Sequence, residues 1–290
     1  MEMIYALLSS VMFAATFLLV KIGRESASHL SVLWITLTIN VVVLALSTLF
    51  IDIPKSLNLL DLKFFIISGI FAPLLGRLFQ FVGMSKLGAN TTTALTLTHP
   101  LITVFIGLLF LDESGNVVQI LGGFLIIAGS VLIAIFSGSN ANLRISNGHQ
   151  IYLLYPLLAS LTYGISIALR KVGIDQLNSP VLASAVTVSS SWTILSLYVL
   201  VTRCKVSCSG REFTYFFFAG ILSSIGPIFL YLSLAIGNLL LIAPLAATTP
   251  LFVLVGTWLY SKKNEKFGYQ IIVGTFGIFI GVTLLTLFKN

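Results

Sequence analysis

Ten apolar stretches, each about twenty residues long, set the strongest limit on how this chain folds. A helix needs about 20 apolar residues to cross the hydrocarbon core of a bilayer. In lipid the backbone must satisfy its own hydrogen bonds, and these runs are too long and too continuous for the strands of a barrel, so we expect helices. The expected spans cover residues 3–22, 31–50, 62–85, 91–110, 117–137, 150–171, 181–202, 213–235, 240–260 and 268–288.

Composition excludes a water-soluble protein. Hydrophobic residues make up 57% of the chain and charged residues 9%, against about 45–50% and about 25% in soluble domains. The net charge of +7 comes from loops and helix ends, so contact with lipid headgroups accounts for it without any nucleic acid. We expect a multi-pass protein of the cell (plasma) membrane, monomeric or homodimeric, whose partners are the lipid bilayer and a small-molecule substrate.

The chain has two cysteines, Cys204 and Cys208, in one expected loop. Two free thiols fit this arrangement, and so does a disulfide if the loop faces an oxidising compartment. Two sulfur ligands without a neighbouring histidine do not complete a zinc site. We therefore expect no metal and no cofactor.

The second half of the chain repeats the first at an offset of 150 residues. Lys21 and Pro100, for example, recur as Lys171 and Pro250. Each half has five expected spans, and an odd number makes the second half enter the membrane from the opposite face, as in many secondary transporters. We predict an all-α membrane protein with ten transmembrane helices in two inverted five-helix repeats, at residues 1–137 and 150–290, with a linker at 138–149.

The segment from Pro100 to Ile133 resembles the fourth and fifth helices of an EamA-type repeat in the drug/metabolite transporter superfamily. The matching positions are Pro100, Glu113, Gln119, Gly122, Gly123 and Gly129, with Lys21 at the end of the first span and Arg170 and Lys171 at the end of the sixth. The resemblance covers essentially all 290 residues. It implies ten helices, a central cavity near the middle of the bilayer, alternating access and cytoplasmic termini. In the second repeat, Lys262 and Lys263 replace Asp112 and Glu113.

The distribution of basic residues indicates the opposite orientation. The side of the termini is expected to carry Lys55, Lys63, Arg170, Lys171 and Lys289, against ten lysines and arginines on the other side. The positive-inside rule then places both termini outside. Both orientations stay open at this point.

Arg77 is the clearest charged residue within an expected span. A central Arg costs about 2.5–3.5 kcal/mol on insertion scales, so it requires a reason. Gln80 follows three residues later on the same helix face. An anion anchor facing a cavity explains Arg77, and so does a side chain that snorkels or binds helix-end carbonyls.

The fourth expected span carries a polar stripe on an otherwise apolar helix. Its members are Thr92, Thr96, His99 and Thr103. Pro100 removes a helical hydrogen bond beside His99, and Thr249 and Pro250 repeat this arrangement in the ninth span. Paired interruptions indicate the binding site of a transporter, although hydrogen bonds between packed helices also explain the stripe.

Aromatic and hydroxyl side chains form a second matched pair. Phe13 and Thr16 in the first span correspond to Tyr163 and Ser166 in the sixth. Such faces suit a small amphipathic substrate, and ordinary core packing explains them equally well. We add Tyr231 of the eighth span to these candidates.

Acidic residues are absent from the middle of every expected span, which leaves Arg77 and His99 as the ionisable groups at mid-membrane depth. A positive or neutral cavity favours a substrate with a carboxylate or another anionic group over a lipophilic cation. Any proton coupling would pass through His99 or the substrate.

We therefore expect a secondary transporter, and not an enzyme, that exports a small polar metabolite such as an amino acid or similar carboxylate by alternating access. The substrate-binding candidates are Arg77, Gln80, Thr96, His99, Phe13, Thr16, Tyr163, Ser166, Tyr231 and Thr249. Transport of a nucleotide-sugar or phosphorylated metabolite is the alternative, because Arg77 suits a phosphate too. A lipid-modifying enzyme is less favoured, since the three histidines lie on different segments without acidic companions. A structural or sensing subunit is the remaining class.

Overall fold

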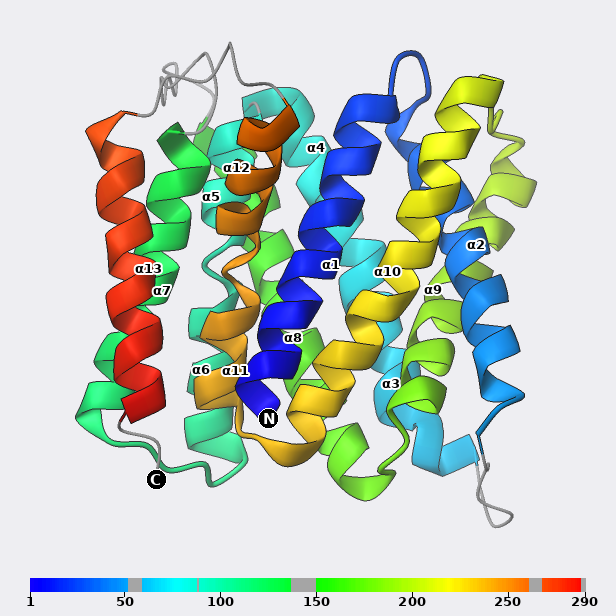
Figure 1. The fold of residues 1–290 in the computed structure, drawn as a ribbon. Coiled ribbons are helices and arrows are strands. Elements are labelled where there is room, and N and C mark those ends of the chain that lie inside the picture. Colours follow the sequence, from blue (N-terminus) through cyan, green and yellow to red (C-terminus); the bar gives the residue numbers. More distant parts are fainter. Residues whose placement is uncertain (52–58, 88, 137–149, 261–267, 288–290) are drawn as a thin grey trace. The chain divides into compact units, whose positions relative to one another are not determined.

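The computed structural model describes residues 1–51, 59–87, 89–136, 150–260 and 268–287, and within them all regular secondary structure is helical. Within them, ten helical stretches are long and apolar enough to cross a membrane (Figure 1). This confirms the predicted fold class and the order of the spans. The predicted linker at 138–149 lies outside the described residues.

Seven of the described spans are single α-helices. They are α1 (Glu2–Gly23), α2 (His29–Thr48), α7 (Val117–Phe136), α8 (Leu154–Gln176), α9 (Pro180–Thr202), α10 (Gly210–Ile236) and α13 (Tyr269–Leu287). Short 3-10 turns precede α3 and α8, at Leu59–Leu62 and Gln150–Leu153.

The other three spans are interrupted. The third consists of α3 (Lys63–Gly69), a π-helical segment (Ile70–Gly76) and α4 (Arg77–Leu87). The fourth consists of α5 (Ala89–Thr96) and α6 (His99–Phe110), and the ninth of α11 (Leu239–Ala246) and α12 (Thr249–Tyr260). Pro73 accounts for the irregular third span, because proline lacks an N–H and its ring clashes with the preceding turn. Such π-helical turns are frequent at functional sites.

The chain packs as two compact units, and each unit contains helices from both halves of the sequence. The first unit comprises Met1–Leu74 and Leu169–Ile236, and the second comprises Leu75–Ala168 and Gly237–Asn290. The boundaries therefore fall within the π-helical segment of the third span, within α8 and in the connection that precedes α11.

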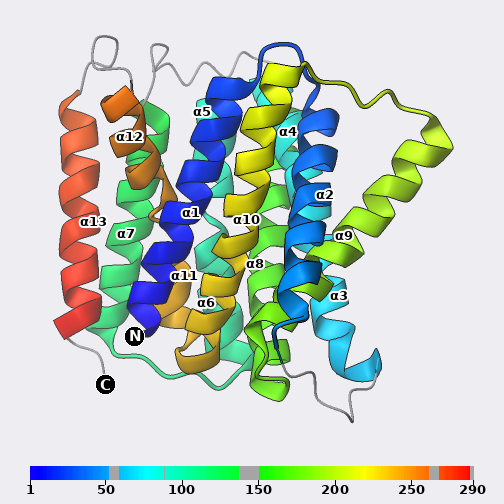
Figure 2. The same ribbon diagram turned by 45° about the vertical axis from the view of Figure 1, so that its right-hand side comes forward.

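In the first unit, α1 and α10 lie side by side and run in opposite directions, and α2 packs against both α9 and α10 (Figures 1 and 2). Buried polar contacts tie these helices together. The Ser9 hydroxyl donates to the carbonyl of Gly226 over 2.9 Å, and the Asn40 amide donates to the carbonyl of Ser223 over 3.0 Å. Interhelical hydrogen bonds of this kind hold membrane helices together where the hydrophobic effect does not.

In the second unit, α7 and α13 form a close antiparallel pair lined by glycines. A Cβ added at Gly122 would lie 2.9 Å from the carbonyl oxygen of Gly281, and one added at Gly274 would lie 2.8 Å from that of Gly129. The two backbones thus approach as closely as their atoms permit, which is how small residues stabilise helix pairs in lipid.

The inversion of the repeats is visible inside each unit. The fifth and tenth spans, α7 and α13, run in opposite directions within the second unit (Figure 1). The second and seventh spans, α2 and α9, do the same within the first unit. Corresponding helices of the two halves therefore cross the membrane in opposite senses, as the odd number of spans per half predicts.

Candidate functional site

The two interrupted helices of the second unit break at equivalent positions. The chain leaves α5 after Thr96 and enters α6 at His99, and it leaves α11 after Ala246 and enters α12 at Thr249. The turns match in detail: the Thr98 hydroxyl donates to the Leu95 carbonyl over 2.7 Å, and the Thr248 hydroxyl donates to the Leu245 carbonyl over 2.7 Å. The paired interruptions that the prolines predict are present in the structure.

The break in the fourth span corrects the prediction of one continuous polar stripe. The Thr96 hydroxyl, on α5, donates to the carbonyl of Thr92 over 2.8 Å. The Thr103 hydroxyl, on α6, lies 3.2 Å from both the His99 and Gly164 carbonyls. These hydroxyls therefore donate to backbone carbonyls, and that of Thr103 also stabilises the contact between α6 and α8, as the packing interpretation expects. In the ninth span, the Thr249 hydroxyl donates to the Ala246 carbonyl over 3.1 Å.

His99 is held by the free backbone at the break. Its Nδ1 atom lies 3.0 Å from the carbonyl oxygen of Thr96. A carbonyl only accepts hydrogen bonds, so Nδ1 carries the hydrogen, and Nε2 of the neutral ring is an acceptor. The first residue of α6 thus offers an acceptor at mid-span.

Tyr163 connects His99 to α4. The Tyr163 ring centroid lies 5.8 Å from that of the imidazole, and its hydroxyl donates to the Gln80 amide oxygen over 3.1 Å. Gly76 allows this approach, because a Cβ there would lie 3.0 Å from Cζ of Tyr163. The structure therefore assembles Gln80, Thr96, His99 and Tyr163, which the sequence places in three separate spans, into one contact chain within the second unit.

Arg77 begins α4, where the π-helical segment ends, and is half-buried. It lies three residues before Gln80, so both side chains leave the same helix face. Its guanidinium makes no hydrogen bond or ion pair with another residue in the described part of the chain. The contact chain and Arg77 together provide one positive charge, one amide, one imidazole acceptor and one phenol. Ser166, on α8, is completely buried.

Three predicted residues belong to the first unit. Phe13 packs against α10, where a Cβ added at Gly226 would lie 3.2 Å from its ring. Thr16 is buried, and its hydroxyl donates to the Met12 carbonyl over 2.9 Å. Tyr231 is completely buried, and its hydroxyl lies 2.6 Å from that of Thr187. Their role in substrate binding stays a prediction.

Arg170 corrects the predicted end of the sixth span. We expected this span to stop at residue 171, but α8 continues to Gln176 and encloses Arg170, which is 6% exposed. Its Nε donates to the Ser68 hydroxyl over 3.1 Å, and its guanidinium carbon lies 5.6 Å from the Tyr231 ring centroid. Arg170 is thus a buried charged residue inside α8, which the sequence analysis placed at the end of the sixth span. The sequence did contain a signal that the helix continues past residue 171. Lys171 and Asp175 are four residues apart, the spacing at which opposite charges pair on a helix, and they form an ion pair in the structure.

Glu113, the carboxylate of the family pattern, binds the start of α11. Its two oxygens accept hydrogen bonds from the backbone N–H groups of Leu239, over 2.8 Å, and Leu240, over 3.1 Å. Backbone N–H groups at a helix start lack partners within the helix, and the helix dipole favours a negative charge there. Glu113 is therefore a structural cap that joins the α6–α7 loop to the ninth span.

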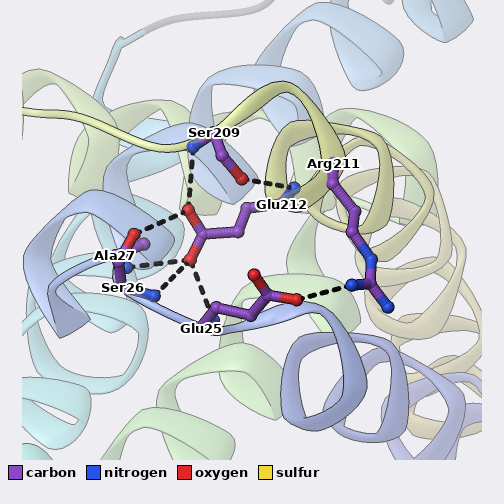
Figure 3. Close-up of polar contacts among 6 residues, drawn as sticks. All are labelled: Glu25, Ser26, Ala27, Ser209, Arg211 and Glu212. Atoms are coloured by element: carbon purple, nitrogen blue, oxygen red, sulfur yellow. Dashed lines mark hydrogen bonds and ion pairs between the residues drawn. The ribbon is translucent and has the colours of Figure 1, made fainter.

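Glu212 performs a similar task in the first unit (Figure 3). One carboxylate oxygen accepts from the backbone N–H groups of Glu25, Ser26 and Ala27, over 2.9, 2.7 and 2.9 Å. The other accepts from the N–H group of Ser209 over 2.8 Å. This completely buried side chain holds the loop between α1 and α2 against the start of α10.

A groove of about 580 Å³ lies elsewhere, in the first unit between α2, α3 and α9. Its lining is mostly apolar and includes Ile66, Ala185 and Ser189, but none of the predicted site residues. Among the described residues, no group of three or more His, Cys, Asp or Glu side chains is placed to hold a metal ion. The contact chain of the second unit is therefore the stronger candidate site.

The ten described spans define a multi-pass membrane protein whose two halves are inverted repeats. A family model described as the EamA-like transporter family matches the chain twice, at residues 1–135 and 150–287. The chain therefore belongs to the EamA-like transporter family of the drug/metabolite transporter superfamily, and is a membrane transporter of that type.

A solved crystal structure, described only as that of a protein, shares the fold. It has a TM-score of 0.83 and 13% sequence identity, and the match covers 99% of this chain and 98% of that one. No curated protein matches the sequence. The family resemblance of the Pro100–Ile133 segment is confirmed.

Proposed function

We propose that this transporter exports a small metabolite with a carboxylate group, such as an amino acid, across the plasma membrane by alternating access. The observation that carries the proposal is the guanidinium of Arg77, which has no hydrogen-bond or ion-pair partner among the described residues. It is half-buried within a span and leaves the same helix face as Gln80. A charge at this depth is costly, and a carboxylate that binds it with charge-assisted hydrogen bonds offsets the cost.

The remaining groups of the contact chain complement the other end of an amino acid. Nε2 of neutral His99 accepts a hydrogen bond from a substrate ammonium group, since Nδ1 is bound to the Thr96 carbonyl. Gln80 keeps its amide N–H groups for the ligand, because its oxygen accepts from Tyr163. The Tyr163 ring offers an apolar face to the substrate side chain. Ser166 and Thr249 remain further candidates from the same unit.

The charge of the site favours a carboxylate over a phosphate. Apart from Lys86 at the end of α4, Arg77 is the only lysine or arginine among the described residues of the second unit. One guanidinium balances a monoanionic carboxylate, whereas a phosphomonoester carries a charge of about −1.5 to −2 near neutral pH. Nucleotide-sugars and phosphorylated metabolites are therefore the competing substrates in the test.

Counterflow in proteoliposomes tests the proposal. Vesicles loaded with one unlabelled amino acid should accumulate the same labelled amino acid, and vesicles loaded with phosphorylated solutes should not accumulate theirs. Arg77→Gln, which keeps a polar side chain, should strongly reduce the accumulation. If amino acids of every side-chain class fail to give counterflow and a phosphorylated solute succeeds, the substrate is a phosphorylated metabolite and not an amino acid.

Export requires a separate measurement. Cells preloaded with the labelled substrate should lose it faster when they express the protein than when they express Arg77→Gln. Equal rates of loss, with faster uptake in the wild type, would reverse the proposed direction.

A further inference from the structure

The groove of the first unit lies between three helices that do not all pack together. α9 packs against both α2 and α3, whereas in the described part of the chain α2 and α3 make few contacts with each other (Figure 2). The groove is therefore walled by α2 and α3, and α9 forms its floor. Its lining residues all belong to the first unit, so it is separate from the contact chain of the second.

The groove begins at one end of the spans and runs toward their middle. Thr48 is the last residue of α2, Ile66 lies one turn after the start of α3, and Leu182 lies in the first turn of α9. The lining then follows α9 as far as Ile194, over about 18 Å at 1.5 Å per residue. Half of a hydrocarbon core of about 30 Å is about 15 Å. The groove thus has about the depth of one leaflet.

Most of the polar groups in the lining are already used by the protein. Three of the four lining hydroxyls, those of Thr48, Ser190 and Thr193, donate to backbone carbonyls of their own helices, over 2.7, 2.9 and 2.8 Å. The remaining surface is apolar. A polar metabolite would lose its hydration in this groove without gaining equivalent hydrogen bonds, whereas an acyl chain has no hydrogen bonds to lose.

The size of the groove also excludes a helix from a partner protein. A helix about 10 Å across and about 18 Å long occupies roughly 1,400 Å³. The groove holds about 580 Å³, less than half of that volume. A single extended hydrocarbon chain is thin enough to follow it.

A charged side chain stands at the mouth of the groove. Lys63 is the first residue of α3 and precedes the lining residue Ile66 by three positions, so both lie on one helix face. Its side chain is exposed, and its ammonium nitrogen lies 5.0 Å from the Phe64 ring centroid. Asp61 lies in the turn that precedes α3 and balances the charge of Lys63. A headgroup that carries one positive and one negative charge complements this end of the groove.

We propose that the groove binds a zwitterionic phospholipid, such as phosphatidylethanolamine, with one acyl chain against α9 and the phosphate at Lys63. The second acyl chain lies in the surrounding bilayer. The ammonium of a lysine binds phosphate as a point charge, and the buried chain joins α2 to α3 across the gap between them. The site does not depend on the substrate proposed above.

Melting temperatures of delipidated protein in detergent test the proposal. Phosphatidylethanolamine should raise the melting temperature, because a ligand that binds the folded state stabilises it. Diacylglycerol has the same chains without the phosphate and should raise it less. Glycerophosphoethanolamine has the headgroup without the chains and should leave it unchanged. A rise with diacylglycerol equal to that with the phospholipid would overturn the phosphate contact.

Filling the groove tests where the chain binds. Val186→Trp places an indole in the groove and should remove the stabilisation by phosphatidylethanolamine. Leu197→Trp is the matched control, because Leu197 lies on the same helix outside the groove and is 56% exposed. Ile194→Trp is a second blocking variant at a partly exposed lining position, where an indole does not disturb the core. Full stabilisation of both blocking variants, or equal losses in these and in Leu197→Trp, would show that the lipid does not occupy the groove.

The headgroup contact is tested at Lys63. An exposed ion pair contributes little, so Lys63→Gln should weaken the binding of phosphatidylethanolamine about 1.4- to 5-fold. Lys63→Arg keeps the charge and should bind normally. Lys205→Gln is the control, because Lys205 is exposed in the α9–α10 loop at the opposite end of the unit. Native mass spectrometry with a lipid titration measures all three. Unchanged affinity in Lys63→Gln, or tighter binding of anionic phosphatidylglycerol than of phosphatidylethanolamine, would overturn the proposed headgroup.

Discussion

Tyr163 donates a hydrogen bond to the amide oxygen of Gln80 over 3.1 Å and so joins α8 to α4. In the proposed site, this bond turns the Gln80 oxygen toward Tyr163 and leaves the amide N–H groups for the ligand. The Tyr163 ring in turn stands beside His99, at the break between α5 and α6. A change at one of these residues should therefore alter substrate affinity through the others.

Tyr163→Phe should weaken substrate binding moderately. The variant keeps the ring beside His99 and removes the bond to Gln80. A neutral hydrogen bond contributes about 0.5–1.5 kcal/mol, so we expect a loss of affinity of about 2- to 12-fold. Tyr155→Phe is the matched control, because Tyr155 lies on the same helix and its ring stacks on Tyr152. The concentration dependence of counterflow gives the substrate affinity of both variants. An equal loss of affinity in the two variants would show that Tyr163 is not part of the site.

Arg77→Ala should have a larger effect than Arg77→Lys. A hydrogen bond to a charged group contributes about 1.5–3 kcal/mol, which corresponds to a loss of affinity of about 10- to 150-fold. Lysine keeps the charge but not the planar fork that binds a carboxylate at two points, so its loss should be intermediate. Substrate titration in proteoliposomes gives the order. Unchanged affinity in the alanine variant would mean that Arg77 snorkels, as the alternative interpretation holds.

Glu212→Gln should destabilise the protein even though the side chains have nearly the same shape. Both carboxylate oxygens accept hydrogen bonds from backbone N–H groups, and an amide turns one acceptor into a donor that faces a donor. Glu25→Gln is the control, because Glu25 is 55% exposed and its pair with Arg211 contributes little to stability. The melting temperature in detergent should fall clearly for the first variant and hardly for the second. Equal melting temperatures would contradict the role that Figure 3 indicates.

Gly129→Ala should loosen the pair formed by α7 and α13. A Cβ at this position would overlap the carbonyl oxygen of Gly274. Overpacking of this kind typically costs about 1–3 kcal/mol. Gly277→Ala lies in the same helix pair, but its Cβ would lie 3.6 Å from the nearest atom, an ordinary contact. Unfolding in a denaturant series should show that Gly129→Ala is less stable than Gly277→Ala. Equal stability of the two variants would show that the helix pair accommodates the Cβ at position 129 at no cost.

The spans and their breaks were predictable from local sequence because their causes are local. Hydrophobic length identifies a membrane helix, and Pro100 and Pro250 remove hydrogen bonds within their own helices. The third span was harder, because Pro73 predicts a local irregularity but gives no sign that the turn becomes π-helical. Close packing in this span also depends on a distant helix, since a Cβ at Gly69 would overlap the carbonyl of Thr187.

The roles of the buried and half-buried charged residues were not predictable, because their partners are distant in sequence. Glu113 binds the N–H group of Leu239, 126 residues away, and no local pattern pairs the two. Arg170 is located correctly only once α8 is known to continue to Gln176. The candidate site was predicted as a set of residues, but the bond between Tyr163 and Gln80 depends on how α8 packs against α4.

The claim that Arg77 binds a carboxylate is tested most directly by ligand-induced changes in melting temperature. Wild-type protein and Arg77→Gln are heated in detergent with a panel of amino acids, other small carboxylates and phosphorylated metabolites. A ligand at 100 times its Kd stabilises the folded state by about 2.7 kcal/mol. We predict that at least one amino acid or similar carboxylate raises the melting temperature of the wild type and raises that of Arg77→Gln much less. An equal rise in both proteins, or a rise with phosphorylated metabolites alone, would contradict the proposed site.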